Sequence, residues 1–492
     1  MPDFMFDNSF ARLPAACYRD VKPTPVPEPK LVIFNRSLAD DLGIANAAQL
    51  PDEYLAAVFS GNMIPGGAQP LAMAYAGHQF GHFVPALGDG RAILLGEVIS
   101  RCMRRYDLQL KGAGRTPFSR QGDGRYALGP ALREYLISEA MHALGIPTTR
   151  SLSLTLTGEP VWRQVKHPGA VLCRLAESHL RIGTFQYFSA RNDLQTLQAL
   201  VDYSIARLCP EVAFTKEPLI NFIRHVQALQ ASLVAQWMAV GFIHGVMNTD
   251  NVALSGETLD YGPCAFMDTF DPDTVFSSID TVGRYSWGQQ PQAARWNLAR
   301  WIEALLPLFE GPEEARVNVA NMLLAEFDTT FEYNWHRLLA RKLGIVQYRA
   351  GDENLAQELL SLMAASEADF TDTFSSLADT LEHAESKDLL DDIFVDQRAW
   401  KNWQRRWLAR LEQETLPLRL IADEMRKMNP VIIPRNHVVE SVIAAAEQDS
   451  NFVPFHQALE DLRHPWQVRK NTGFDYSAAA STGRNYRTFC GT

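Results

Sequence analysis

The sequence has few cysteines, and no pattern joins them. Six cysteines are spread over 492 residues, and none belongs to a CxxC pair. Small secreted domains depend on dense disulfides, and the common structural zinc sites need closely spaced cysteine pairs. The composition therefore argues against a disulfide framework and against a cysteine-based zinc site.

Long hydrophobic runs and a basic surplus are also missing. No stretch approaches the roughly 20 apolar residues of a membrane-spanning helix, and the start, MPDFMFDNSFARLP, lacks the basic and apolar regions of a signal peptide. The net charge of −11 argues against general nucleic-acid binding, because phosphate contacts need clustered cations. We therefore expect a cytoplasmic protein that binds neither a membrane nor nucleic acid.

The chain is too long for one compact core and should divide into parts. Proline-rich loops and short amphipathic pieces predict an N-terminal extension over residues 1–82. Strand patterns with one helix predict a small lobe over 83–190, and helical patterns predict a second lobe over 191–345. More helices follow over 346–462, before an irregular tail over 463–492.

Two segments of the predicted small lobe carry charged residues that could form a lysine–glutamate pair. The runs RAILLGEVI and YDLQLKG flank a short polar turn and predict a hairpin, whose alternation puts Lys111 on the polar face of the second strand. The segment PALREYLISEAMHALGIP then predicts a helix that carries Glu134 and Glu139. A lysine that holds ATP phosphates is commonly positioned by a helix glutamate, and either glutamate is a candidate partner.

Glycine turns occur twice near these segments. LGDGRA holds Gly88 and Gly90 directly before a predicted strand, and QGDGRY repeats the Gly-Asp-Gly pattern at residues 121–126. Glycine lets the backbone approach a phosphate closely, and exposed amide groups can donate to it. The pattern is also that of an ordinary turn.

The segment HGVMNTDN, residues 244–251, carries the most information. Small-molecule kinases have His-Gly-Asp, four residues and then Asn in their catalytic loop, and here His244, Gly245 and Asn251 keep those places. The position of the usual aspartate is Val246, which cannot accept a proton, while an acidic group stands at Asp250. Ordinary kinase chemistry is therefore in doubt.

The segment LDYG follows across the short turn SGET. Its Asp260 stands where kinase-like proteins place the metal-binding aspartate of Asp-Phe-Gly. A hairpin would bring Asn251 and Asp260 to one edge of a cleft, where their oxygens suit a hard divalent cation. The order of these motifs predicts an α+β fold of two lobes, like a protein kinase, with an N-terminal extension and additional C-terminal helices.

Longer motifs make the resemblance specific. The stretches AYAGHQFGHFVPALGDGRA, LQLKGAGRTPFSRQGDGRYALGP and HGVMNTDNVALSGETLDYGPCAFMD, with the final NYRTFCGT, resemble the selenoprotein O family over nearly the whole chain. The resemblance implies a pseudokinase fold that binds ATP in a reversed orientation. It implies transfer of AMP, or of UMP from UTP, to Ser, Thr or Tyr hydroxyls of proteins with release of pyrophosphate.

The resemblance also implies roles for individual residues. Asp250 would be the catalytic base, and Asn251 with Asp260 would bind Mg²⁺ or Mn²⁺. The nucleotide would contact Gly88, Gly90, Arg91, Lys111, Asp123, Gly124, Arg174, Arg181 and Asp260. Arginines are suitable here because a guanidinium binds phosphate in a bidentate manner.

Other interpretations stay open. Asp250 could serve a small-molecule phosphotransferase, or the chain could be a pseudokinase that binds nucleotide without catalysis. His78 and His82 have helical spacing, but GHQFGH is interrupted by glycine and favours no metal pair. The family resemblance suggests a disulfide between Cys264 and Cys490 that forms under oxidising conditions; two free thiols are the alternative.

Overall fold

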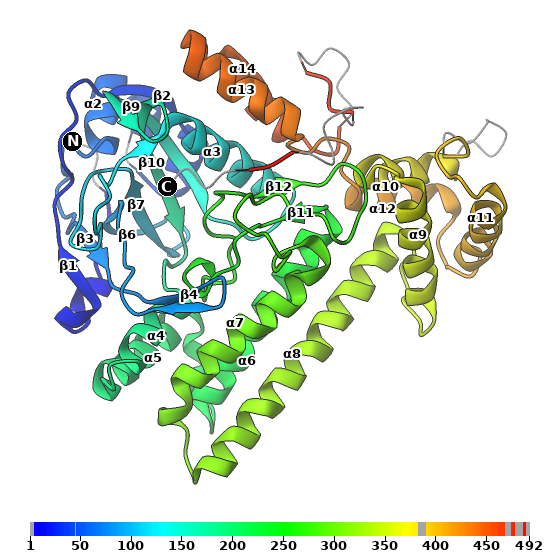
Figure 1. Cartoon of the computed structure of the whole chain (residues 1–492), viewed down its shortest axis with the longest axis horizontal. Helices are drawn as coiled ribbons and strands as arrows, with labels where there is room; N and C mark the ends of the chain where they lie inside the picture. Colours follow the sequence, from blue (N-terminus) through cyan, green and yellow to red (C-terminus); the bar gives the residue numbers. More distant parts are fainter. Residues whose placement is uncertain (1–3, 45, 382–389, 468–473, 478–485, 489–492) are drawn as a thin grey trace.

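A computed structural model describes residues 4–44, 46–381, 390–467, 474–477 and 486–488. It is a mixed α/β structure with antiparallel sheets and many helices (Figure 1). Strands dominate up to residue 176, and helices dominate from residue 182 onward. In the described part of the chain, no helix is long and apolar enough to cross a membrane.

An antiparallel sheet forms the first part. Its strands follow the order β1-β3-β6-β7-β10-β9-β2, and β8 pairs with β10. The predicted hairpin is confirmed, since Ala92 pairs with Lys111 and Ile99 with Arg105. The strands are β1 (Tyr18–Asp20), β2 (Lys30–Phe34), β3 (Leu71–Met73), β6 (Ala92–Ile99), β7 (Arg105–Lys111), β8 (Tyr126–Ala127), β9 (Arg150–Trp162) and β10 (Lys166–Ala176).

The predicted extension contributes to this sheet. Strands β1 and β2 are its two edges, and β3 pairs with β6. Two short helices, α1 (Arg36–Asp41) and α2 (Asp52–Phe59), pack in the same apolar cluster as one face of the sheet. Residues on both sides of position 82 therefore build one sheet, which explains why the extension is not a free domain.

The predicted helix near residue 130 is α3 (Leu128–Ala143), with Pro130 in its first turn. It is buried almost all round because the sheet covers one side and α13 (Asn436–Asp449) and α14 (Val453–Leu462) cover another. Figure 1 shows α13 and α14 beside α3, although the sequence separates them by about 300 residues. The C-terminal helices thus hold the helix that carries Glu134.

Long helices build the second part. α6 (Pro218–Ala239) packs against α7 (Gln290–Leu305) and α8 (Glu313–Lys342). Short hairpins lie between the two parts: β4 (Gly77–Gln79) with β5 (His82–Val84), and β11 (Phe242–Ile243) with β12 (Ala265–Phe266). The other helices are α4 (Ile182–Ser189), α5 (Leu194–Leu208), α9 (Asp352–Ser366), α10 (Phe370–Thr380), α11 (Gln397–Leu411) and α12 (Leu418–Met428).

Candidate active site

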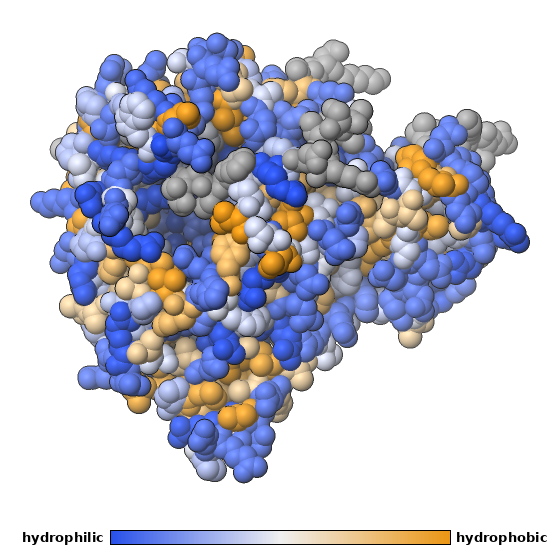
Figure 2. Space-filling view, in the orientation of Figure 1, coloured by the Kyte–Doolittle hydropathy of each residue, from blue (hydrophilic) through white to orange (hydrophobic). Residues whose placement is uncertain are grey.

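A cavity of about 480 Å³ lies between the sheet and the 244–263 segment. Strands β6, β7 and β10, both glycine turns and the β4–β5 hairpin contribute to its walls. Figure 2 shows a hollow with hydrophilic walls where β7 and β10 lie in Figure 1. The predicted catalytic base and all residues predicted to contact nucleotide or metal line this cavity: Asp250, then Gly88, Gly90, Arg91, Lys111, Asp123, Gly124, Arg174, Arg181, Asn251 and Asp260.

Lys111 is held by two carboxylates. Its Nζ lies 2.7 Å from Oε2 of Glu134 on α3 and 2.6 Å from Oδ1 of Asp260. The pairing with Glu134 settles the choice between the two glutamates, since Glu139 faces the other way and pairs with Arg150 at 2.8 Å. Lys111 is buried, so the polar face of β7 points into the site and not to open solvent.

Arg174 on β10 joins the same cluster. Its Nη1 lies 3.1 Å from Oε1 of Glu134 and 2.7 Å from Oδ1 of Asp260, while its Nε donates to Gln109. The guanidinium is buried, so it is not a surface arginine. Glu134, with Lys111 and Arg174 on its two oxygens, positions both cations on one side of the cavity.

Arg181, which directly precedes α4, approaches from the helical side. Its Nη1 lies 3.2 Å from Oδ1 of Asp89, and its guanidinium stacks 4.4 Å from the ring centre of Tyr75. Its Nη2 lies 3.9 Å from Oδ2 of Asp260. Asp260 therefore faces three cations: Lys111, Arg174 and Arg181.

These charges decide the ionisation of the acids. Burial disfavours the charged form of Asp260, but the charges of Arg174, Lys111 and Arg181 outweigh it and hold the pKa well below the usual range. Burial likewise opposes ionisation of Glu134, while Lys111 and Arg174 lower its pKa. Both carboxylates are ionised at neutral pH.

Asp260 also has an unusual backbone. Its φ is +66°, a left-handed conformation that non-glycine residues rarely adopt. The preceding bridge between Val252 and Thr258 confirms the short hairpin predicted from the turn SGET. The hairpin and the three cations hold Asp260 in this conformation, which fits a residue placed for chemistry.

Asp250 lies on the other side of the cavity, under the β4–β5 hairpin. Gln79 donates to its Oδ2 at 3.4 Å, and its buried Oδ1 has no hydrogen-bond partner among the described residues. Gly77 leaves the necessary space, because a Cβ there would lie 2.6 Å from Oδ1. Burial raises the pKa of Asp250 from 3.8 to about 6, so a base suited to neutral pH results.

Asn251 and Asp260 suit a divalent cation. The amide nitrogen of Asn251 donates to the carbonyl oxygen of Val246 at 3.1 Å, which orients its side chain and leaves the amide oxygen as an acceptor. The Oδ2 atom of Asp260 is at 3.9 Å from Arg181 and forms no hydrogen bond with it. An amide oxygen and a carboxylate oxygen are donors that Mg²⁺ and Mn²⁺ accept.

The first glycine turn differs from the expectation. The N–H groups of Gly88 and Asp89 donate to the carbonyl oxygens of Tyr75 and Met73, so these amides do not face a phosphate. Gly88 is needed for packing instead: its φ is +71°, and a Cβ would lie 2.3 Å from the ring of Phe118. The turn thus carries Asp89 to its buried ion pair with Arg181.

The second glycine turn is also a packed structure. A Cβ at Gly124 would lie 2.1 Å from the carbonyl oxygen of Gly114. The carboxylate of Asp123 pairs with Arg163 at 2.8 Å and accepts from the N–H of Arg125. Asp123 therefore orients Arg163, which also lines the cavity.

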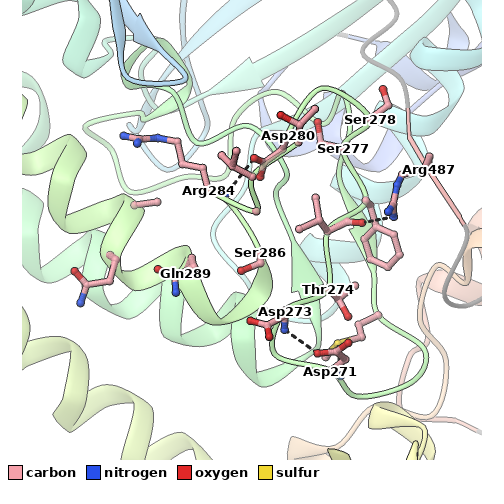
Figure 3. A pocket seen from close by; sticks show the side chains of 18 of the residues that line it. Asp271, Asp273, Thr274, Ser277, Ser278, Asp280, Arg284, Ser286, Gln289 and Arg487 are labelled. Atoms are coloured by element: carbon pink, nitrogen blue, oxygen red, sulfur yellow. Dashed lines mark hydrogen bonds between the residues drawn. The ribbon is translucent and has the colours of Figure 1, made fainter.

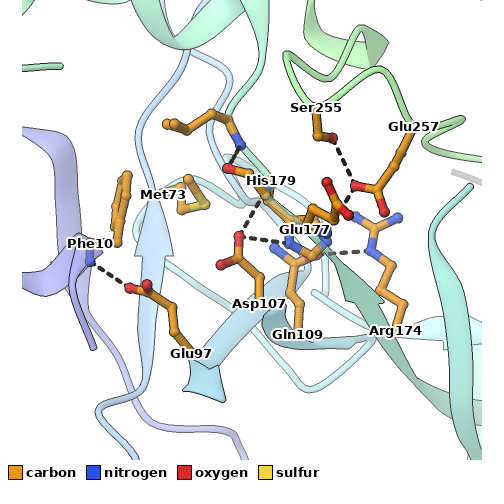
Figure 4. A network of polar contacts seen from close by, with 12 residues as sticks. Phe10, Met73, Glu97, Asp107, Gln109, Arg174, Glu177, His179, Ser255 and Glu257 are labelled. Carbon is orange, nitrogen blue, oxygen red and sulfur yellow. Dashed lines mark hydrogen bonds and ion pairs between the residues drawn. The ribbon is translucent and has the colours of Figure 1, made fainter. Parts of the chain in front are cut away.

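A second polar network supports the strands behind the site (Figure 4). Asp107, next to Gln109 on the polar face of β7, accepts from the N–H of His179 at 2.7 Å and from Nη2 of Arg207 at 2.6 Å. Arg207 lies on α5 and also pairs with Glu97. The strand that carries Lys111 is thereby fixed to the helical part.

The comparisons with known proteins agree with this geometry. A family model described as "Protein adenylyltransferase SelO" matches residues 2–463. The chain belongs to the SelO family. It is 52% identical over 493 residues to a protein nucleotidyltransferase YdiU of Rhizobium meliloti (strain 1021), covering 100% of each chain. A protein of the same name from Geobacillus kaustophilus (strain HTA426) is 50% identical over 487 residues, covering 99% of each. The chain is thus a protein nucleotidyltransferase.

Sequence reasoning missed several residues of the candidate site. No sequence motif indicates a role for Tyr75 or Gln79. Asp89 is the middle residue of the first Gly-Asp-Gly, a pattern that is also that of an ordinary turn. His78 and His82 do not form a helical pair, because they lie on opposite strands of the β4–β5 hairpin. The hairpin instead donates the N–H of His78 to the hydroxyl oxygen of Thr249 in the 244–251 segment.

The disulfide suggested by the SelO resemblance stays a prediction. Cys264 is buried, and burial raises the pKa of its thiol to about 12, while Cys490 lies outside the described residues. The nearby Thr488 is buried and donates its hydroxyl to the carbonyl oxygen of Pro263 at 2.6 Å. A described piece of the C-terminal tail therefore lies against the residue that precedes Cys264.

Proposed function

We propose that this protein transfers AMP from ATP to hydroxyl groups of Ser, Thr or Tyr in other proteins and releases pyrophosphate. The observation that carries the proposal is the charge of the cavity. Seven cationic side chains and four aspartates line it: Arg91, Lys111, Arg120, Arg125, Arg163, Arg174 and Arg181 against Asp89, Asp123, Asp250 and Asp260. The lining side chains thus carry more positive than negative charge, which favours binding of a triphosphate.

In this proposal Asp250 is the general base. The acceptor O–H loses its proton to the carboxylate of Asp250, whose pKa of about 6 leaves it ionised at neutral pH. The acceptor oxygen then forms a bond to the α-phosphorus, and the bond to the bridging oxygen breaks. The electron pair leaves with pyrophosphate, and the proton stays on Asp250 until solvent removes it.

The cations stabilise the charge that develops on the leaving group. Arg174, Arg181 and Lys111 present guanidinium and ammonium groups to one cavity, and groups that are already fixed in place stabilise developing charge more effectively than mobile water does. Arg174 and Lys111 are prealigned by Glu134, so little rearrangement is needed during the reaction. A Mg²⁺ or Mn²⁺ ion held by Asn251 and Asp260 would neutralise phosphate charge when bound.

We also infer that the two parts form the lobes of a protein-kinase-like fold. The ion pair between a strand lysine and a helix glutamate supports this, as does Asp260 after a hairpin that follows the His-Gly loop. Val246 stands at the place of the usual kinase aspartate and is buried, which favours chemistry by Asp250. UTP is proposed as an alternative donor for the same site.

Two variants separate binding from chemistry. Asp260→Asn removes one proposed metal-binding oxygen and leaves Lys111 and Arg174 with one carboxylate fewer, so both nucleotide affinity and turnover should change. Asp250→Asn should keep nucleotide affinity and lose about 10²–10⁴ in turnover. Calorimetric titration with ATP beside single-turnover assays checks this. Near-normal turnover of both variants contradicts the assignment.

A further inference from the structure

A second cavity, of about 1370 Å³, adjoins the first. Its walls are the irregular segment 267–286, residues between 289 and 300 in and just before α7, and Arg487 (Figure 3). Ile279 lines the first cavity, while its neighbours Ser278 and Asp280 line the second. One loop therefore separates this larger cavity from the site that contains Asp250.

The separating loop is fixed to the catalytic segment. Asp280 accepts from the N–H groups of Arg284 and Tyr285 at 2.9 and 2.8 Å. The hydroxyl of Tyr285 donates to Oδ1 of Asn248 at 2.8 Å, two residues before Asp250. The loop that separates the two cavities is therefore bonded to the segment that carries Asp250, which fixes the position of one cavity relative to the other.

The end of the larger cavity beside this wall is cationic. The guanidinium of Arg284 lies 4.6 Å from the ring centre of Trp296, and that of Arg300 lies 5.4 Å from it. Within the described chain, Arg284 forms no ion pair with a carboxylate, and the partner of Arg300 is the exposed Glu303 on the same helix. Such an exposed pair is weak. Asp280 lies beside the same wall, but its two carboxylate oxygens already accept from backbone N–H groups.

The opposite end is acidic. Asp271 and Asp273 are exposed there, and Figure 3 shows them away from Arg284 and Asp280. Val282, whose apolar side chain is 86% exposed, also lines this cavity. The cavity thus has a cationic end, an acidic end and an exposed apolar side chain in its lining, which fits an extended ligand that binds in one direction.

The cavity is larger than a typical small-molecule pocket. Pockets for small molecules measure about 300–1000 Å³, whereas this cavity of about 1370 Å³ is larger and open along the loop. A transferase that acts on proteins must hold a stretch of its acceptor beside the base. The cationic and acidic ends of this cavity would favour segments whose charges are complementary to them.

We propose that the larger cavity binds an extended segment of the acceptor protein, with an acidic side chain on the Arg284–Trp296–Arg300 cluster. The hydroxyl that accepts AMP then reaches Asp250 across the Ile279 loop. This inference rests on the proposed function and adds the acceptor class to it: hydroxyl-bearing segments with a nearby acidic residue. An aromatic ring between two arginines gives that acidic group a partly desolvated partner.

Synthetic peptides test the inference. Two peptides carry a single Tyr and differ only in Glu or Lys at the positions that flank it, and transfer is measured from alpha-labelled ATP. The wild-type protein should modify the Glu peptide about tenfold faster. Arg284→Glu should invert the preference, whereas Arg284→Lys should retain it, because the charge is kept. Arg405→Glu, an exposed change on α11, is the matched control and should leave the preference unchanged.

The outcomes distinguish the two proposals. If the wild-type protein transfers no alpha label to any protein or peptide, the proposed function fails. If it does transfer label but treats both peptides alike, or if Arg284→Glu keeps the wild-type preference, the docking inference is overturned. ATP titration of each variant identifies a misfolded protein; should Arg284→Glu lose ATP binding, Arg300→Glu must show the inversion, and its failure to do so equally overturns the inference.

Discussion

Replacing Glu134 by Gln removes the acid that aligns two cations of the site. Oε2 of Glu134 accepts from Lys111 and from the hydroxyl of Tyr126 at 2.9 Å, and its Oε1 accepts from Arg174. Glutamine keeps the shape but carries no charge and has one acceptor oxygen. Lys111 and Arg174 then share Asp260 as their remaining carboxylate partner.

The expected cost follows from burial. Removing one partner of a buried ion pair typically costs about 3–5 kcal/mol, and both Lys111 and Glu134 are buried. The stability loss should lie in this range. Because the displaced cations no longer face the phosphates correctly, turnover should fall about 10²-fold.

Glu139→Gln is the matched control on the same helix. Glu139 is equally buried and accepts from Arg150 and Asn35, but it lies outside the cavity. Urea unfolding and AMP-transfer assays, run where both variants are folded, should show destabilisation for each and lost turnover for Glu134→Gln alone. Equal turnover of the two variants would refute the role given to Glu134.

Two further predictions concern protonation. Because the pKa of Asp250 is about 6, kcat/KM should fall about tenfold per pH unit below pH 6, and Asp250→Asn should remove this limb from the pH profile. Lys342 is buried against the rings of Phe374 and Phe370, and burial lowers its pKa from 10.5 to about 7. Between pH 7 and pH 10.5, Lys342 is therefore protonated in the unfolded chain but neutral in the folded protein. The free energy of unfolding should accordingly rise with pH over this range. Lys342→Met should raise the unfolding temperature at pH 7 and flatten this dependence in thermal scans; an unchanged slope would contradict it.

The sequence was sufficient where a motif determines local geometry. The alternation in YDLQLKG placed Lys111 on the polar face, and the turn SGET between Asn251 and Asp260 predicted their hairpin. Helix α3 was also predictable, since its apolar residues recur and Gly145 with Pro147 ends it. These features depend on residues close together in the chain.

The rest depended on contacts between distant segments. The choice of Glu134 over Glu139 is made by the packing angle of α3, which α13 and α14 help to set. Asp89 meets Arg181 across 92 positions, so no local pattern could reveal the pair. The larger cavity was also missed, because segment 267–286 has no regular structure to predict.

The most direct test of the central claim is to measure which phosphate of ATP, the alpha or the gamma, becomes attached to the acceptor. The protein is incubated with a hydroxyl-bearing acceptor protein and either alpha-labelled or gamma-labelled ATP, and the acceptor is then separated. We predict that only the alpha label stays on the acceptor, while the gamma label leaves as pyrophosphate. Retention of the gamma label on the acceptor would mean phosphate transfer and would contradict the account.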